Sequence, residues 1–370
     1  MTINNEHKKL NVPNLRFPEF QGEWEKIELQ DIVPNICSGK DKISNSGKVV
    51  LYGSTGVIGK TDFASYKKNI VLVARVGANA GQLQIGNAPC GVTDNTLVID
   101  AKEWNYYIYY FLQHYNLNRL VFGSGQPLIT GGMLKKIKVG HGNKVERIKI
   151  TRLLCLLDKR IATQNKIIED LKKLKYAIIE MEYGNMAKSI SHIGDFIEQT
   201  SKRNKDSVIL NVLSVSNSQG FIQQSEQFEN RIVASDDTSN YKIVARNDFA
   251  FNPARINVGS IARLTTFERG IVSPMYICFR TKDNLFPEYL DYYFESKRFF
   301  AEIQKRLEGS VRQCLSFEGL CNIPLCIPTV EVQQQIGKRL STLAKEIKLE
   351  IDFLELLQRQ KRFLLHQIFI

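Results

Sequence analysis

The stretch from Gly53 to Thr61 (GSTGVIGKT) carries residue types that can bind phosphate groups. A P-loop has the pattern G-x-x-x-x-G-K-[ST]. Counted back from Gly59, the position of its first glycine is taken by Ser54. We therefore predict no nucleotide site here. We interpret the stretch as a tight turn whose side chains Ser54, Thr55 and Lys60 can meet phosphates and base edges.

Two other motifs suggest cofactor or methyl-transfer chemistry at first sight. Phe122 to Gly125 (FGSG) follows an expected helix, whereas a dinucleotide or methyl-donor loop follows a strand. Asn252 to Arg255 (NPAR) lacks the second proline and the aromatic residue of the adenine methyltransferase motif, so nothing there would stack on a flipped base. The sequence therefore predicts no methyl transfer by this chain alone.

The histidines and cysteines form no recognisable metal site or catalytic group. No Cys-x-x-Cys pair occurs, and the closest cysteines, Cys321 and Cys326, have no histidine nearby. We expect reduced, mostly buried thiols and no metal. The five histidines are scattered along the chain: His7, His114, His141, His192 and His366. No apolar run could span a membrane and no signal peptide is recognisable, so we expect the protein in the cytoplasm.

Two long helices must position whatever chemistry the chain has. Residues 145–183 contain no Gly or Pro, and a shift of 186 positions places them on residues 331–369 with the same heptad pattern. The apolar core positions of the first copy are Leu154, Leu157, Ile161, Ile168, Leu171 and Ile178. Those of the second are Leu340, Leu343, Ile347, Leu354, Leu357 and Leu364.

Both copies interrupt the apolar pattern at the same two positions. Gln164 aligns with Glu350, and Lys175 aligns with Lys361. The alternative is two unrelated amphipathic core helices, but shared interruptions favour one helix packing on its own duplicate. We predict an antiparallel pair, because a parallel pair would force the intervening chain to bridge the whole helix length.

The two globular halves also repeat one plan. In the first half, β-type runs occur at 49–52, 70–76, 83–85 and 96–99, followed by a helix at 104–118 and a strand at 134–139. In the second half, a single helix is expected at 287–307. Short matches relate the two halves at three offsets. At an offset of 164, residues 29–32 match 193–196 and residues 54–58 match 218–222. Residues 74–76 match 254–256 at an offset of 180, and residues 123–124 match 309–310 at an offset of 186.

The sequence therefore predicts an α+β protein. Two similar mixed α/β domains would be separated by a long antiparallel two-helix coiled coil, as a pseudo-twofold internal repeat. The expected boundaries are residues 1–141 for the first domain, 142–183 for the first helix, 184–330 for the second domain and 331–370 for the second helix.

The chain is basic, with a formal net charge of +12. The four predicted segments carry +5, +4, +1 and +2 in chain order. Basic proteins are attracted to polyanions such as nucleic acid, although charge alone does not establish that partner.

Two variable globular halves, each followed by a repeated long helix, resemble the specificity subunit of type I restriction-modification systems. The most specific pieces are Tyr52 to Gly56 (YGSTG), the arm Leu15 to Phe20 (LRFPEF) and the helix core Leu157 to Ile161 (LDKRI) followed by Gln164 and Asn165. One departure is the entry to the first helix, Gly140 to Arg147 (GHGNKVER), which leaves the start of that helix open.

In that family each half is a target recognition domain that reads one part of a bipartite DNA site. The helices set the spacing and dock the modification subunits. The resemblance implies double-stranded DNA, modification (methyltransferase) subunits, two in number, and restriction/translocase subunits as partners, with no membrane. It implies no catalytic residue in this chain, and S-adenosylmethionine and ATP with Mg²⁺ would bind to the partner subunits.

Polar residues at matched loop positions are the candidates for reading DNA, because Arg pairs with guanine and Asn or Gln with adenine. Any one of them could instead be a solvated loop residue or a turn former. The candidates in the first half are Ser54, Thr55, Lys60, Arg75, Asn79, Ser124 and Gln126. Those in the second half are Asn217, Gln219, Arg255, Asn257, Ser310, Arg312 and Gln313.

A second function stays open at this point, namely a coiled-coil scaffold whose two globular ends bind other proteins. Exposed apolar loop faces would favour that function. Variable loops that contain Arg, Asn and Gln in a basic chain favour DNA recognition instead.

Overall fold

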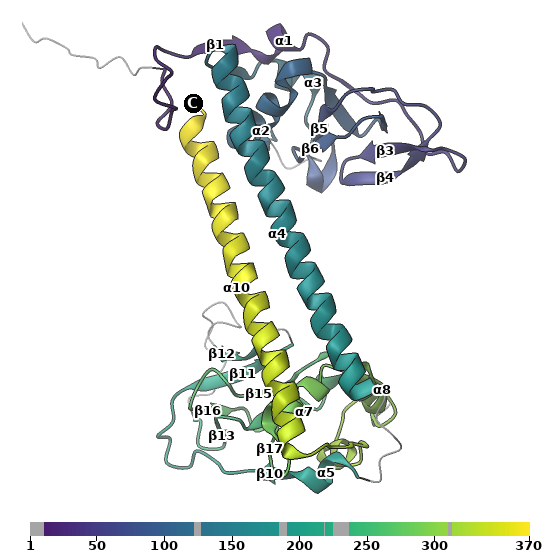
Figure 1. Ribbon diagram of the computed structural model, residues 1–370, viewed down its shortest axis with the longest axis vertical. Coiled ribbons are helices and arrows are strands. Elements are labelled where there is room, and N and C mark those ends of the chain that lie inside the picture. The colour runs from purple at the N-terminus through teal and green to yellow at the C-terminus, as the bar shows by residue number, and fades with distance from the viewer. Residues whose placement is uncertain (1–10, 122–126, 185–190, 218, 225–236, 310–312) are drawn as a thin grey trace, which may run out of the picture. The chain divides into compact units, whose positions relative to one another are not determined.

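The computed structural model describes residues 11–121, 127–184, 191–217, 219–224, 237–309 and 313–370. The chain forms two compact units: unit 1 contains residues 1–165 and 352–370, and unit 2 contains residues 166–351. The long helices α4 (Lys144–Gly184) and α10 (Val330–Ile368) each contribute one part to either unit (Figure 1). Among the described residues, no helix is long and apolar enough to cross a membrane.

Unit 1 contains two sheets and a two-stranded ribbon. The larger sheet has the order β2-β8-β5-β6, from Cys37–Ser38, Thr96–Ile99, Ile70–Ala74 and Leu83–Gly86. The smaller has the order β4-β3-β7, from Gly56–Thr61, Val49–Gly53 and Cys90–Val92. The ribbon pairs β1 (Glu25–Glu28) with β9 (Lys138–His141). Every residue of β5 is buried, as expected for an apolar strand covered on both faces.

Unit 2 repeats this strand order. One sheet is β10-β17-β14-β15, from Ile197–Thr200, Ile277–Thr281, Phe249–Phe251 and Ile261–Arg263. The other is β12-β11-β16-β13, from Gly220–Gln223, Val212–Ser216, Arg269–Val272 and Lys242–Ala245. The parallel pair β3–β7 recurs as β11–β16. Where unit 2 has β13, unit 1 has only an isolated bridge between Tyr66 and Cys90.

The short helices of the two units also correspond. The helices α1 (Leu29–Ile32) and α5 (Ile193–Phe196) each begin with a capping box, closed by Asp31 and Asp195, which confirms the sequence match at an offset of 164. The other helices and 3₁₀ turns of unit 1 are η1 (Gly77–Asn79), η2 (Lys102–Trp104), α2 (Asn105–Tyr115), η3 (Leu117–Leu120) and α3 (Gly131–Lys135). Those of unit 2 are η4 (Ile256–Val258), α7 (Pro287–Tyr293), α8 (Lys297–Gln304) and α9 (Phe317–Cys321).

The core of each unit is built around its aromatic helix, α2 or α7. Tyr107 of α2 packs against Phe369 at 5.4 Å between ring centroids, and Tyr289 of α7 packs against Tyr183 at 4.9 Å. Tyr183 and Phe369 are related by the helix offset of 186. Each domain is therefore anchored to the C-terminal end of one long helix by a matched aromatic contact, in the same core cluster as its sheet.

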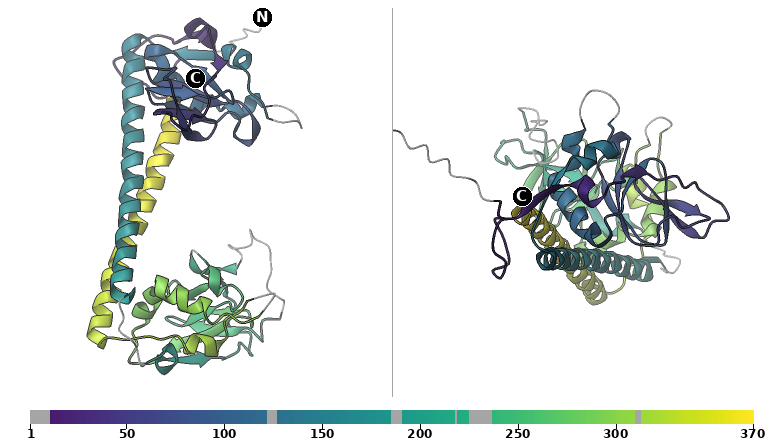
Figure 2. Two further views of the ribbon diagram at one scale, coloured as in Figure 1. Left: turned by 90° about the vertical axis from the view of Figure 1, so that its right-hand side faces the viewer. Right: turned by 90° about the horizontal axis from the view of Figure 1, so that it is seen from above.

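The heptad positions predicted from the sequence are buried or half-buried throughout both long helices. In unit 1 the last residues of α10 lie beside the first turns of α4 (Figure 2). Further along α4, the guanidinium of Arg160 lies 5.1 Å from the centre of the Phe353 ring on α10. In unit 2 Glu182, near the end of α4, pairs with Arg339, near the start of α10. The helices therefore run antiparallel in each unit, as predicted.

Two element predictions were wrong. Residues 134–139 are not one strand, because Thr130 accepts a hydrogen bond from the Met133 amide and starts α3, and the strand β9 begins only at Lys138. Residues 287–307 are not one helix. Ser296 lies after α7 and caps α8 through the Phe299 amide, which divides the segment into two helices.

Candidate nucleic-acid interface

A two-residue turn joins β3 and β4. Gly53 pairs with Gly56 across the hairpin, so Ser54 and Thr55 form the turn, and Gly56 has a φ of +119°, which glycine adopts readily. Strand β4 then continues through Lys60 and Thr61, so no helix N-terminus follows to hold a phosphate. The P-loop interpretation is therefore excluded. Lys60 is exposed on β4 opposite Val50, several residues from the turn.

The turn of unit 1 lies next to the end of strand β5. The carbonyl oxygen of Asn95 accepts a hydrogen bond from the Arg75 amide at 3.0 Å and one from the Ser54 hydroxyl at 3.5 Å. Asn79 ends the following turn η1, where its side chain accepts from Gln82. The structure therefore brings the turn residue Ser54 next to Arg75, and Asn79 follows Arg75 in the same segment after β5.

Unit 2 builds the same arrangement from different residues. Asn217 and Gln219 are exposed in the turn between β11 and β12, and the Ser260 hydroxyl after η4 donates to the Val215 carbonyl next to that turn. Arg255 and Asn257 lie at η4, and the amide of Leu315 donates to the Pro253 carbonyl, which brings Gln313 to the same side. Five of the seven candidates in this half thus gather at one end of unit 2.

The arginines of the two halves are not equivalent, contrary to the sequence match at an offset of 180. Leu72 and Ala250 occupy equivalent positions in the strand pairing, at an offset of 178. At the same offset, the hydrogen bond from the Ala80 amide to the Gly77 carbonyl corresponds to the one from the Val258 amide to the Arg255 carbonyl. At this offset Asn79 corresponds to Asn257, but Arg255 corresponds to Gly77 and Arg75 to Pro253. The loops share an asparagine and place their arginine two residues apart.

Several arginines of unit 2 form ion pairs, whereas the two candidate arginines that the structure describes do not. In unit 2, Arg246 pairs with Glu268, Arg263 with Glu288 and Asp291, Arg280 with Asp248, and Arg306 with Glu302. By contrast, neither Arg75 nor Arg255 makes an ion pair or a side-chain hydrogen bond to any described residue. A guanidinium whose donors have no partner within the protein is available to a ligand.

Four candidates lie outside the described residues, namely Ser124, Gln126, Ser310 and Arg312. The structure also exposes apolar side chains that sequence reasoning did not select. Phe63 is 79% exposed and Val57 61% exposed, both on or next to β4. Only three-dimensional structure identifies them, because alternation within a strand does not reveal which face lacks a partner.

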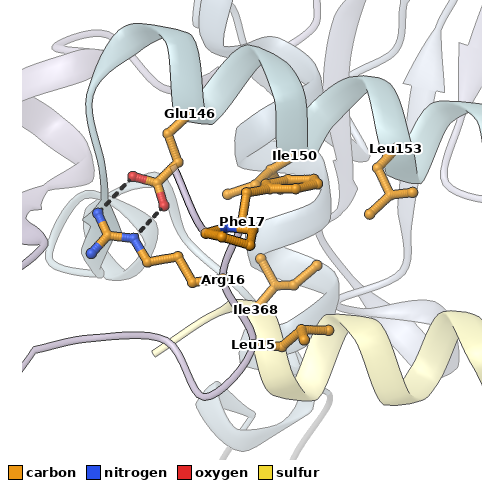
Figure 3. A pocket seen from close by; sticks show the side chains of 8 residues that line it. Leu15, Arg16, Phe17, Glu146, Ile150, Leu153 and Ile368 are labelled. Carbon is orange, nitrogen blue, oxygen red and sulfur yellow. Dashed lines mark hydrogen bonds and ion pairs between the residues drawn. The ribbon is translucent and has the colours of Figure 1, made fainter. Parts of the chain in front are cut away.

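The arm from Leu15 to Phe20 is structural in unit 1. The Arg16 guanidinium donates to both oxygens of Glu146, a carboxylate with no exposed surface, at 2.8 and 2.9 Å (Figure 3). The Trp24 indole donates to the same carboxylate. The pKa of Arg16 is raised by this hydrogen bond. A cavity of about 150 Å³ beside the pair is lined mainly by apolar residues, including Phe17, Ile150 and Ile368. These apolar side chains cannot act as an acid, a base or a nucleophile.

No group of three or more His, Cys, Asp or Glu side chains in the described parts of the chain is placed to hold a metal ion. The candidate residues that the structure describes supply hydroxyl, amide and guanidinium groups. Such groups can bind phosphates and base edges.

Comparison with known families identifies the chain. The family described as "Type I restriction modification DNA specificity domain" matches it twice, over residues 21–173 and 191–359. The chain belongs to this family. It therefore carries two DNA specificity domains, and its function is the recognition of DNA sequence in type I restriction-modification.

Solved structures share the fold of both specificity domains. The S subunit of a type I restriction-modification system from M. genitalium has a TM-score of 0.66 and 16% identity, covering 97% of this chain and 99% of that one. A chain from a study titled "Structural basis underlying complex assembly and conformational transition of the type I R-M system" has a TM-score of 0.52 and 11% identity, covering 94% and 97%. These likenesses extend over nearly the full length of the chain.

Proposed function

We propose that this chain reads a bipartite DNA site, with one target recognition domain for each part. The first domain, residues 1–141, would use the surface formed by Ser54, Arg75 and Asn79. The second, residues 184–330, would use Asn217, Gln219, Arg255, Asn257 and Gln313. The observation that carries the proposal is the duplicated specificity domain, with an arginine that has no partner among the described residues in each copy.

The chain would recognise DNA without catalysing a reaction. Modification subunits, two in number, would dock on the helices at 142–183 and 331–370 and supply the methyltransferase site with S-adenosylmethionine. Restriction subunits would supply the translocase with ATP and Mg²⁺. This division is supported by the candidate surface, which offers hydrogen-bond donors and acceptors but no acid–base pair. The complex would act in the cytoplasm.

The first test measures how the full chain binds DNA in increasing salt. Contacts with about six phosphates should lower the affinity roughly 10³-fold between 50 and 200 mM salt. Scrambling either half-site should remove most of the specificity, while changes in the spacer sequence should matter little. A single contiguous footprint, or an affinity that does not depend on salt, would contradict the proposal.

The second test separates recognition from catalysis. The purified chain should transfer no methyl group from labelled S-adenosylmethionine to its site. Adding modification subunits should produce methylation within that site. Methyl transfer by the chain alone would show that it has a donor site of its own.

A further inference from the structure

Two lysines interrupt the apolar seam of the long helices at equivalent positions. Lys175 of α4 and Lys361 of α10 are related by the offset of 186, and their side chains are 19% and 18% exposed. A lysine at a seam position costs stability relative to leucine, because its ammonium group must lose water. Its occurrence in both copies therefore requires a reason other than seam packing.

Each lysine reaches the aromatic helix of its own unit. The Lys361 ammonium lies 5.6 Å from the centre of the Tyr110 ring on α2, and the Lys175 ammonium lies 5.1 Å from the Tyr292 ring on α7. Tyr110 and Tyr292 are equivalent, since an offset of 182 also relates Tyr107 to Tyr289. A cation over an aromatic face is attractive, more so where water is excluded. Both tyrosines are buried.

The acidic partners of the two lysines come from different elements. Lys361 pairs at 2.6 Å with Asp158, which is on α4 and also accepts from the Tyr110 hydroxyl. Lys175 pairs with both oxygens of Glu295, which follows α7, at 2.8 and 2.7 Å. The position equivalent to Asp158 is Ala344, and that equivalent to Glu295 is Gln113. The lysine and the tyrosine are thus common to both units, whereas the acid is not.

We propose that Lys361 and Lys175 are positioning residues that fix the orientation of each target recognition domain on the helices of its own unit. The proposal rests on the proposed function, because orientation matters only if the domain reads DNA at a set distance. A seam leucine would hold the two helices together equally well but would give the domain no directional contact. A charge held by one carboxylate over one ring defines a single arrangement.

Spacing between half-sites is the first measurement. The full chain is titrated with duplexes whose spacer is native, or shorter or longer by one base pair, which moves one half-site by about 3.4 Å. We expect the wild-type chain to prefer the native spacer. Lys361→Met and Lys175→Met should each reduce that preference roughly tenfold, about 1.4 kcal/mol, while binding to the best spacer changes less. Lys→Arg at either position should restore much of the preference.

Hydrogen exchange of the full chain without DNA is the second measurement. Lys361→Met should speed exchange in α2 (Asn105–Tyr115) and leave α7 (Pro287–Tyr293) unchanged, and Lys175→Met should do the reverse. The matched controls are Lys345→Met and Lys172→Met, exposed lysines on the same two helices. They should change neither spacer preference nor exchange.

The outcomes separate this inference from the proposed function. If the wild-type chain shows no spacer preference or does not bind DNA, the proposed function fails, whatever the exchange data show. If it prefers one spacer and the methionine variants keep that preference, or if exchange in α2 and α7 is unaltered, the positioning role is overturned. A variant that loses binding to all spacers equally, with a lowered melting temperature, would show a purely structural role and would also overturn it.

Discussion

The two units share a scaffold but enter their long helices differently. In unit 1 the buried polar group at the start of α4 is Glu146, which receives the arm through Arg16 and Trp24. In unit 2 the buried polar side chain in the first turn of α10 is Gln333, which aligns with Arg147 rather than with Glu146 at the offset of 186. Its amide donates to the carbonyls of Asn284 and Pro328 and accepts from the Phe286 amide. In each copy one buried polar side chain needs hydrogen-bond partners, and the neighbouring segment of the chain supplies them.

The loops that contain the candidate DNA-reading residues have diverged further than the scaffold. Both units keep the asparagine, Asn79 or Asn257, after the central strand, but Arg75 and Arg255 occupy positions two residues apart. The hairpin turns also differ, with two residues between Gly53 and Gly56 and three between Ser216 and Gly220. Strand pairing is constrained by burial, whereas loop side chains are free to change with the target.

The largest test of this comparison exchanges the second recognition domain only. Replacing residues 184–328 by the same segment of a relative should change one half of the recognised site completely and leave the other half intact. Specific and non-specific binding typically differ by about 10³-fold or more, so sequencing of methylated sites in the assembled complex would detect the switch. A change in both halves would mean that the two domains do not read DNA independently.

The next test concerns the arm, which the described part of unit 2 lacks. Arg16→Ala leaves the Glu146 carboxylate buried without its cation and should cost unit 1 about 3–5 kcal/mol. Lys149→Ala removes a second ion pair between the same arm and the same helix, to Glu19, but both side chains are nearly half exposed, so a much smaller loss of stability is expected.

Urea unfolding followed by tryptophan fluorescence measures this effect, because both tryptophans of the chain, Trp24 and Trp104, belong to unit 1. Equal urea midpoints for Arg16→Ala and Lys149→Ala would mean that the Arg16–Glu146 pair does not hold the arm on unit 1.

A smaller effect is expected for the two arginines. Arg255→Ala should cost about 1–3 kcal/mol of discrimination at one base pair of one half-site, and Arg75→Ala the same in the other. Because the side chains are not at equivalent positions, the affected base pair should differ in its distance from the spacer. Binding competition against single-base substitutions checks this. Arg246→Ala is the matched control, since its guanidinium pairs with Glu268, and it should leave base preference unchanged.

The smallest expected effect is a pH dependence of the stability of unit 2. Burial raises the pKa of Asp291 from 3.8 to about 6, although Arg263 opposes the shift. The folded state then binds a proton more tightly than the unfolded state, so this group stabilises unit 2 below about pH 4, and that stability is lost as pH rises through about 6. The side chain is 31% exposed, so solvent screening limits the effect to about 1–2 kcal/mol.

Thermal unfolding of Asp291→Asn against the wild type at several pH values tests this prediction. The variant should gain stability relative to the wild type between about pH 4 and pH 7. The exposed Asp283→Asn is the control and should show no such trend. If the difference in stability between Asp291→Asn and the wild type did not change with pH, Arg263 would already compensate the buried carboxylate.

The sequence by itself determined the duplicated plan. Heptad spacing and shared interruptions predicted the two long helices, because helical periodicity is local and can be read along one segment. Their antiparallel direction was predicted from connectivity, because a parallel pair would force the intervening chain to bridge the whole helix length. Alternating and apolar runs predicted β-strands at 49–52, 70–76 and 96–99 for the same reason, and the structure has strands at Val49–Gly53, Ile70–Ala74 and Thr96–Ile99. The boundary errors fell at 134–139 and 287–307, where a capping Thr or Ser begins a new helix within a helical or apolar pattern.

Only the tertiary structure decided which residues meet. The carbonyl of Asn95 joins Ser54 to Arg75, and Arg16 reaches a carboxylate 130 residues away. The sequence marked Lys175 and Lys361 as interruptions of a seam, but their contacts with Tyr292 and Tyr110 were not visible in it. Such contacts depend on how strands and helices fold against one another. The repeat also matches at different offsets in different segments, namely 164, 178 and 186, so the sequence alone does not show which residues of the two halves are equivalent.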